Sequence, residues 1–441
     1  MKFSKANTAV GGYAEKTQEL RQRIIFTILA LVVYRIGTYI PLPGINPIVL
    51  KQISAQNQGG ILGMLNMFSG GALGRMTIFA LNVMPYITAS IIMQMLATTS
   101  KNLEELKKSG TSGRTKVNQY TRYLTVVLAL FQGFGIAIGL ESLSSSAGSA
   151  VMYSGFFFRL TTVITLTGST MFLIWLGEQI TGRGLGNGIS LIIFAGIVAE
   201  LPGAFVSTFE LGRTGVLSTG LILSVIIAVI GLIALIVIME RSLRNLIIQY
   251  PKRQAGAYSG ESSYLPLKLN TAGVIPPIFA SSILLFPITI LSFGEVGSDS
   301  TLVSFVTTNL AHGKPLFMVL YSALIIFFGF FYTAIVFNSK DTADYLKRFG
   351  GYIPGIRPGA ATAQYLDNVL TRLTLYGTLY LALVCVIPEF VIAKYSLPFY
   401  LGGTSLLIVV NVAIDTMTQA QTHLISHRYE SIMKKTKIKS R

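Results

Sequence analysis

Cysteine and histidine are almost absent from this chain. Its 441 residues include one cysteine, Cys385, and three histidines. A lone cysteine excludes an intrachain disulfide and a thiolate metal site. His423 and His427 lie four residues apart near the C-terminus, but no third ligand accompanies them, so we expect no metal there. The sequence therefore predicts neither redox chemistry nor a bound cofactor.

Charge is also scarce, and acidic charge most of all. Only 12% of the residues are charged, with 18 Asp and Glu against 35 Lys and Arg, which leaves a formal net charge of +17. By contrast, 51% of the residues are hydrophobic, and the mean hydropathy is +0.61. This balance excludes an ordinary soluble globular protein. We predict an all-α polytopic membrane protein.

No group of residues typical of an enzyme is present. We find no set of nucleophile, base and orienting residue. The glycine-rich run Gly182–Gly188 matches neither a P-loop nor a dinucleotide-binding fingerprint, and no predicted strand precedes it. Ionisable residues within the apolar runs are few, and Arg35, Glu178 and Asp415 all lie near span ends. The sequence therefore predicts no enzyme and argues against an ion-coupled transporter.

Ten apolar runs are long enough to cross a membrane. They cover residues 24–40, 77–97, 121–140, 157–177, 188–206, 217–239, 272–291, 316–337, 370–389 and 401–420. The first run resembles a signal peptide in position, but no small-residue cleavage site follows it, so we expect it to be retained. An even number of spans places both termini on one side of the membrane.

Basic residues are concentrated in alternate loops. With both termini inside, the inside segments carry 28 of the 35 basic residues. These segments are 1–23, 97–123, 177–188, 240–270, 338–372 and 421–441. Cytosolic loops of membrane proteins are enriched in Lys and Arg. The charge pattern therefore predicts that both termini are cytosolic.

One apolar segment is too short to span. Residues 61–69 form a nonamer with a glycine pair at each end, Gly59-Gly60 and Gly70-Gly71. As a helix it would cover roughly 15 Å, half of a hydrocarbon core about 30 Å thick. Backbone that does not span is tolerated at membrane depth only inside protein or beside a watery cavity. We interpret this segment as a stopper in a pore, held by two flexible glycine joints.

Proline lies in the middle of two predicted spans. Pro85 is in the second span, and Pro276-Pro277 is in the seventh. Proline removes a helical hydrogen bond and bends the helix, so we expect a bend in each span. Either these are ordinary kinks, or the two helices separate to form a side opening; the sequence leaves both open.

A ring of branched aliphatic residues would seal such a pore. Val83 and Ile87 are four residues apart and share one helical face. A constriction of stiff apolar side chains excludes water and ions without any charge. On their own these two residues also fit a lipid-facing or core position. The candidates on other spans are Ile192, Ile278 and Ile408.

Two cytosolic loops, 240–270 and 338–372, are long enough to project from the membrane. In the second loop, proline and glycine make a rigid tip of Ile353–Gly359 around Arg357. Such a tip presents one guanidinium to a carboxylate or phosphate on a partner. In the first loop, Lys252 and Arg253 suit either a partner or anionic lipid headgroups.

Several motifs resemble one known family in order and spacing. They are Pro41–Gly44, Asn66–Gly71, Met84–Ile87, Gly186–Ser190, Ala272–Pro276, Ile356–Gly359 and Gly402–Leu406. They resemble the SecY family, the channel subunits of bacterial protein translocons and their eukaryotic counterparts, and the resemblance covers nearly the whole chain. Pro251 and Pro277 depart from the family pattern.

The resemblance implies ten transmembrane helices in two pseudo-symmetric five-helix halves around an hourglass pore. The single domain 1–441 would comprise an N-terminal half 1–206, a C-terminal half 207–420 and a basic cytosolic tail 421–441. A re-entrant plug helix would close the pore. The plug residues implied are Ile61, Leu62, Gly63, Met64, Leu65, Asn66, Met67, Phe68, Ser69 and Gly70.

The resemblance also assigns roles to single residues. Val83, Ile87, Ile278 and Ile408 would form the pore ring, with either Leu191 or Ile192 as the fifth-span member. Three residues would lie at a lateral gate between spans two and three and spans seven and eight: Thr88, Gln132 and Phe286. Three would dock a motor or ribosome: Lys252, Arg253 and Arg357.

The implied activity is passive conduction of unfolded secretory polypeptides, with lateral release of transmembrane segments into lipid. The implied partners are SecE and SecG, the SecA ATPase, the ribosome with its nascent chain, signal sequences and membrane lipids. The location would be the bacterial cytoplasmic inner membrane. Two other classes remain: a secondary transporter with a broken helix and a small-molecule site near mid-bilayer, and a membrane scaffold without a pore.

Overall fold

The structure is a computed structural model. It describes residues 4–47, 49–50, 69–142, 144–145, 148–214, 218–250, 263–293, 314–395 and 402–439. The elements in chain order are α1 (Ser4–Gly37), α4 (Met84–Thr99), α5 (Lys101–Lys108), α6 (Thr111–Ser142), β1 (Ser144–Ser145), β2 (Gly148–Ser149), α7 (Phe156–Arg183), α8 (Gly188–Arg213), α9 (Thr219–Arg241), β3 (Leu243–Ile248), β4 (Ser263–Lys268), α10 (Ile275–Phe293), α12 (Pro315–Val336), α13 (Ser339–Arg348), α14 (Ala360–Tyr395) and α15 (Gly403–Lys439).

Each of the ten predicted spans coincides with one helix in the described part of the chain: α1, α4, α6, α7, α8, α9, α10, α12, α14 and α15. Six helical segments are long and apolar enough to cross a membrane by length and composition. They include α9, which has a mean hydropathy of 3.4 over its most apolar window. The chain is a multi-pass membrane protein.

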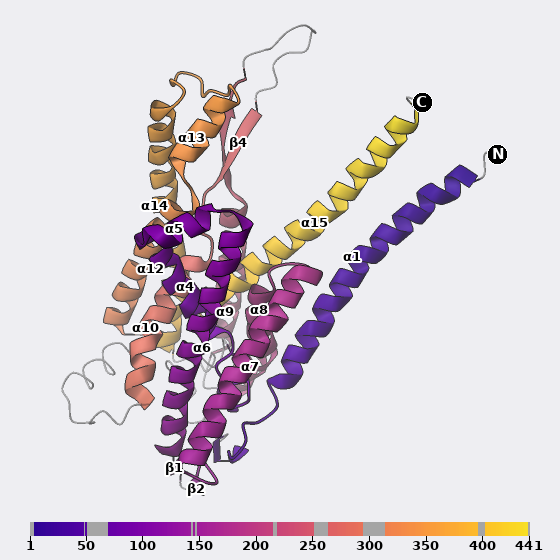
Figure 1. The fold of residues 1–441 in the computed structure, drawn as a ribbon. Coiled ribbons are helices and arrows are strands. Elements are labelled where there is room, and N and C mark those ends of the chain that lie inside the picture. The colour runs from indigo at the N-terminus through magenta and orange to yellow at the C-terminus, as the bar shows by residue number, and fades with distance from the viewer. Residues whose placement is uncertain are drawn as a thin grey trace.

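The helices form an elongated bundle from which α1 and α15 extend together (Figure 1). The N-terminal end of α1 and the C-terminal end of α15 lie on the same side of the molecule as α5, α13 and β4. Among the first five spanning helices, α6 contacts α4 and α7, and α7 contacts α1 and α8; among the last five, α12 contacts α10 and α14, and α15 contacts α9 and α14. Between these two sets, α10 contacts α4 and α6, and α15 contacts α8.

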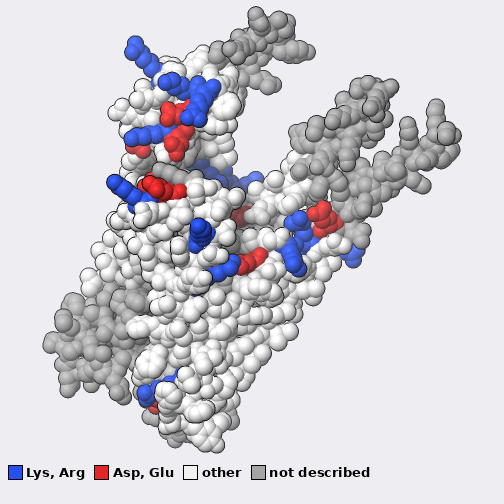
Figure 2. All heavy atoms as spheres, in the orientation of Figure 1, with Lys and Arg blue, Asp and Glu red and all other residues white. Residues whose placement is uncertain are grey.

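Charged side chains are unevenly distributed along the bundle. Figure 2 shows most Lys, Arg, Asp and Glu side chains at the end that carries α5 and α13. A broad uncharged band follows, and a small charged group lies at the opposite end. This is the distribution expected when an apolar belt faces lipid and one end is basic.

Arg–Glu pairs join α6 and α7 at both ends. Arg122 Nη2 lies 2.5 Å from Glu178 Oε1 near one end, and Arg159 Nη2 lies 2.6 Å from Glu141 Oε2 near the other. Both pairs lie at the margins of the apolar belt, where charged groups reach water. They hold the two antiparallel helices in register.

The predicted mid-span bends at proline are wrong. Pro85 lies in the first turn of α4, because the chain from Ser69 to Val83 forms turns rather than helix. Pro276 and Pro277 likewise lie in the first turn of α10. Proline suits this position, since the first-turn N–H groups have no helical partner and its φ is already helical. All three prolines therefore lie at the beginnings of helices.

Candidate functional site

Residues near the N-termini of four helices meet at one point within the bundle. Val83 is the N-cap of α4, and Ile87 lies in its first turn. Ile278 lies in the first turn of α10, Ile193 in the second turn of α8, and Ile408 in the second turn of α15. The first two turns of α4, α10, α8 and α15 therefore converge on one region inside the bundle.

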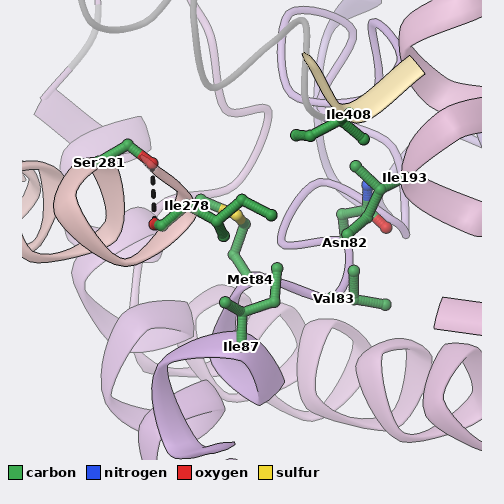
Figure 3. A pocket seen from close by; sticks show the side chains of 8 residues that line it. All are labelled: Asn82, Val83, Met84, Ile87, Ile193, Ile278, Ser281 and Ile408. Atoms are coloured by element: carbon green, nitrogen blue, oxygen red, sulfur yellow. Dashed lines mark hydrogen bonds between the residues drawn. The ribbon is translucent and has the colours of Figure 1, made fainter. Parts of the chain in front are cut away.

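A small cavity lies where these turns meet (Figure 3). It is lined by Asn82, Val83, Met84, Ile87, Ile193, Ile278, Ser281 and Ile408. Its volume is about 10 Å³. A cavity of this volume holds at most about one water molecule. The side chains of Ile278, Ile408 and Ile193 approach the cavity from different helices, so the constriction is almost filled by hydrocarbon.

The two polar side chains at the cavity are held by neighbours. The Asn82 Nδ2 group donates a hydrogen bond to the Tyr34 hydroxyl at 3.5 Å, and Ser281 Oγ donates to the Ile278 carbonyl at 2.9 Å. Asn82 has a φ of +48°, which asparagine adopts more readily than most residues. Asn82 thus makes the sharp turn that aims Val83 and Met84 at the cavity.

The electrostatics of the constriction come from the backbone. Among the described residues, its lining contains no ionisable side chain. Each helix N-terminus carries a partial positive charge of roughly half an elementary charge. The N-terminal ends of α4 and α10 lie at the constriction and disfavour a cation, and the hydrocarbon lining disfavours any ion.

The structure brings four of the five predicted ring residues together. Val83, Ile87, Ile278 and Ile408 all line the cavity. On α8 the lining residue is Ile193, while Leu191 and Ile192 are 6% and 0% exposed in the adjoining hydrophobic core. Sequence reasoning missed Ile193, Asn82, Met84 and Ser281. The ring function of the predicted residues stays a prediction.

Most of the predicted plug lies outside the described residues. This applies to Ile61, Leu62, Gly63, Met64, Leu65, Asn66, Met67 and Phe68. Ser69 and Gly70 are described and buried. Gly70 and Gly71 have φ of +65° and +78°. A Cβ on Gly70 would lie 2.9 Å from Gly196 Cα of α8, so this joint needs glycine both for its backbone angle and for its close packing.

Two arginines bind this glycine joint. Arg35 Nη1 of α1 donates to the Gly70 carbonyl at 2.9 Å, and Arg75 Nη2 donates to the same carbonyl at 3.0 Å. Arg75 Nε also donates to the Gly71 carbonyl at 3.0 Å. The Tyr39 ring lies under both guanidiniums, 5.2 Å from Arg35 Cζ and 4.4 Å from Arg75 Cζ. We call Arg35, Tyr39 and Arg75 the joint clasp.

The predicted gate residues lie on the helices that meet between the two sets. Thr88 lies on α4, where its hydroxyl donates to the Met84 carbonyl at 3.2 Å. Gln132 lies on α6 and is half-buried. Phe286 lies on α10, with its side chain outside the described part. α10 contacts both α4 and α6, so the three residues lie on helices that meet; their gating role stays a prediction.

The two long basic loops, 240–270 and 338–372, pair with each other. Strands β3 and β4 form an antiparallel hairpin in which Leu246 is opposite Leu265. Gln249 at the end of β3 exchanges two backbone hydrogen bonds of 2.9 Å with Tyr352, and the Tyr352 hydroxyl donates to Gln249 Oε1 at 3.1 Å. Ile353 is buried in the cluster beneath. The sequence contains no signal for this pairing.

The pairing fixes the tip that carries Arg357. The Arg357 backbone carbonyl accepts a hydrogen bond from Thr362 Oγ1 at 2.9 Å, while its side chain is exposed. No ion pair to Arg357 occurs among the described residues. Lys252 and Arg253 lie outside the described residues. The tip is thus a rigid mount for one exposed guanidinium.

A family model described as SecY matches residues 77–417. The chain belongs to the SecY family. The protein translocase subunit SecY of Rickettsia conorii is 58% identical over 424 residues, which cover 96% of this chain and 98% of the relative. This membership confirms the resemblance inferred from the motifs and, at the level of the family, the expected role of a protein-conducting channel.

Solved structures confirm the fold. One, of a SecY protein whose plug domain is described as stabilising the closed state of the translocation channel, has a TM-score of 0.65 at 18% identity and covers 92% of this chain and 93% of that one. Another, of Sec61 in the canine ribosome-channel complex from the endoplasmic reticulum, has a TM-score of 0.63 at 17% identity with the same coverage. The predicted ten-helix channel fold is confirmed.

Proposed function

We propose that this chain conducts unfolded polypeptides across a membrane and that the cavity at Ile278 and Ile408 marks the closed waist of an hourglass pore. The observation that carries this proposal is that residues from the first two turns of four helices line one nearly filled apolar constriction. A cavity of about 10 Å³ is far below the roughly 300 Å³ of the smallest typical ligand pocket. It therefore fits a seal and does not fit the substrate site of a small-molecule transporter.

Segments on either side of the waist would move when the pore opens. Movement of the 61–69 segment would clear the pore, and separation of α10 from α4 and α6 would open it toward lipid. A segment of about twenty apolar residues then partitions into the bilayer. Thr88, Gln132 and Phe286 are the proposed gate residues. The gate would open along the contact between the two proposed halves, 1–206 and 207–420.

The energy for conduction comes from outside the chain. SecA or the ribosome would supply it, docking on the paired loops through Lys252, Arg253 and Arg357, while SecE and SecG complete the complex and signal sequences engage the gate. The Sec61 structure in a ribosome-channel complex supports the ribosome as a partner. The basic end of the bundle supports cytosolic termini in a bacterial inner membrane.

Site-specific crosslinking tests conduction directly. With a photo-crosslinking residue at Ile278 or Ile408, a stalled secretory chain is expected to crosslink at both positions, and only when a motor or ribosome drives it. Ile230, which is 61% exposed on α9, is the matched control and is expected to give no crosslink. Failure at both waist positions, or equal crosslinking at Ile230, would contradict the pore assignment and favour a scaffold.

Weakening the joint clasp is expected to loosen the plug. In Arg35→Gln/Arg75→Gln, the Gly70 carbonyl loses two charge-assisted hydrogen bonds, each worth about 1.5–3 kcal/mol. We expect at least a tenfold rise in plug opening, which corresponds to about 1.4 kcal/mol. The measurement is the accessibility of a cysteine at Met64 to a membrane-impermeant thiol reagent, in a Cys385→Ala background.

The control for the clasp is Arg159→Gln. It removes the contact of Arg159 with Glu141 without touching Gly70. In this control, the cysteine in Met64→Cys should react with the thiol reagent as slowly as it does without the substitution of Arg159. If the cysteine in Met64→Cys reacts equally fast with and without the double substitution, and thermal stability is unchanged, the clasp does not restrain the plug.

A further inference from the structure

We propose that a pocket between β3 and α14 binds the phosphate of an anionic phospholipid headgroup. The pocket has a volume of about 330 Å³. It is lined by Ser242, Leu243, Arg244, Leu269, Arg372, Leu373 and Tyr376. This inference does not depend on polypeptide conduction; it requires only that the chain spans a membrane.

Two guanidiniums share this pocket. Arg244 and Arg372 are both exposed, and no ion pair to either occurs among the described residues. Lys268, also exposed, is the register partner of Leu243 and adds a third cation beside the pocket. The acidic residue nearest in sequence, Glu240, is buried and accepts a hydrogen bond from Asn270 Nδ2 at 2.6 Å. Like charges in one pocket repel each other, so a bound anion relieves the repulsion.

The pocket lies at the membrane boundary of α14. Before Arg372, the exposed residues of this helix are small or polar, such as Gln364, Asp367 and Thr371. After it they are apolar or aromatic: Leu375, Tyr376, Leu379, Leu383, Ile387 and Phe390. Exposure changes from water to hydrocarbon within one turn of Arg372, which is where lipid headgroups lie.

The other wall crosses the same boundary. In the second half of α9 the exposed side chains are aliphatic through Ile238, which is 65% exposed, and the helix ends at Arg241. Ser242 and Arg244 follow directly. Both pocket walls therefore change from apolar to basic at the same depth, although they come from distant parts of the sequence.

The chemistry fits a phospholipid better than a free anion. An arginine pair binds phosphate oxygens in a fork geometry, and Tyr376, which is 63% exposed, is of the type enriched at headgroup level. Leu243, Leu269 and Leu373 supply an apolar wall against which the first carbons of the lipid pack. A free phosphate would leave this wall exposed to water.

Native mass spectrometry of the full chain, purified with phosphatidylglycerol or phosphatidylcholine, tests the site. We expect one phosphatidylglycerol retained per chain and no retained phosphatidylcholine. Each guanidinium near an anionic headgroup contributes a factor of about five, so Arg244→Gln/Arg372→Gln should weaken retention about thirtyfold. Arg244→Lys/Arg372→Lys keeps the charge and should retain most of the binding.

Arg183→Gln is the matched control. Arg183 is an exposed arginine in the last turn of α7, and its loss should leave retention unchanged. Equal retention in the Gln double variant and the parent would overturn the proposal. Displacement of the lipid by inorganic phosphate at similar concentration would also overturn it, because the site would then recognise the anion without the lipid.

Discussion

Ile87→Gly/Ile278→Gly is expected to make the closed protein leak ions. Both side chains line the cavity of about 10 Å³, and each substitution removes a four-carbon side chain. Several waters, at about 30 Å³ each, can then occupy the constriction. A hydrated constriction loses the dewetting barrier that excludes ions. We expect at least about a tenfold rise in resting conductance, since a barrier lowered by about 1.4 kcal/mol gives that factor.

The measurement is ion flux from vesicles that contain the purified complex without a motor. Ile227→Gly/Ile230→Gly controls for the cost of glycine in a helix, because both residues are more than 60% exposed on α9 and line no constriction. This control should stay as tight as the parent. A tight Ile87/Ile278 double variant would remove the basis for treating the cavity as a seal.

Arg357→Glu is expected to abolish most motor-driven translocation while leaving the fold intact. The side chain is exposed, so its replacement disturbs no packing. Reversing the charge turns an attraction to a partner's carboxylate or phosphate into a repulsion of several kcal/mol. We therefore expect a loss of about a hundredfold in translocation at limiting motor concentration. The assay is ATP-dependent import of a secretory protein into vesicles.

Arg348→Glu is the matched control for docking. Arg348 lies in the last turn of α13, on the same loop, and is exposed. If docking depends on the rigid tip rather than on general positive charge, this variant should keep most of its activity. Equal losses in both variants would assign the effect to overall loop charge, and full activity of Arg357→Glu would withdraw the docking role.

The sequence predicted the spans because each depends on local composition. About twenty apolar residues in a row form a membrane helix wherever they occur, so all ten predicted runs coincide with helices. It was wrong about the prolines for a related reason. Hydropathy cannot tell a helix from a turn inside protein, and the run from 77 to 83 is apolar but not helical.

The residues that line the waist were only partly predictable from the sequence. Motif matching placed Val83, Ile87, Ile278 and Ile408 together, and the cavity contains all four. On α8 it left Leu191 or Ile192 open and missed Ile193, because all three are large aliphatic residues. Successive residues of a helix point about 100° apart, so only the rotation of α8 within the bundle places Ile193 at the cavity.

By itself, the sequence determined that this chain crosses a membrane many times, which loops are basic, and which family it belongs to, since hydropathy, charge and motif spacing are properties of contiguous residues. Only the tertiary structure decided which side chains meet across distant segments. It brought Gln249 to Tyr352, two arginines to the carbonyl of Gly70, and Arg244 to Arg372 at one depth. Such meetings depend on how helices rotate and pack against one another, and no single stretch of residues encodes that packing.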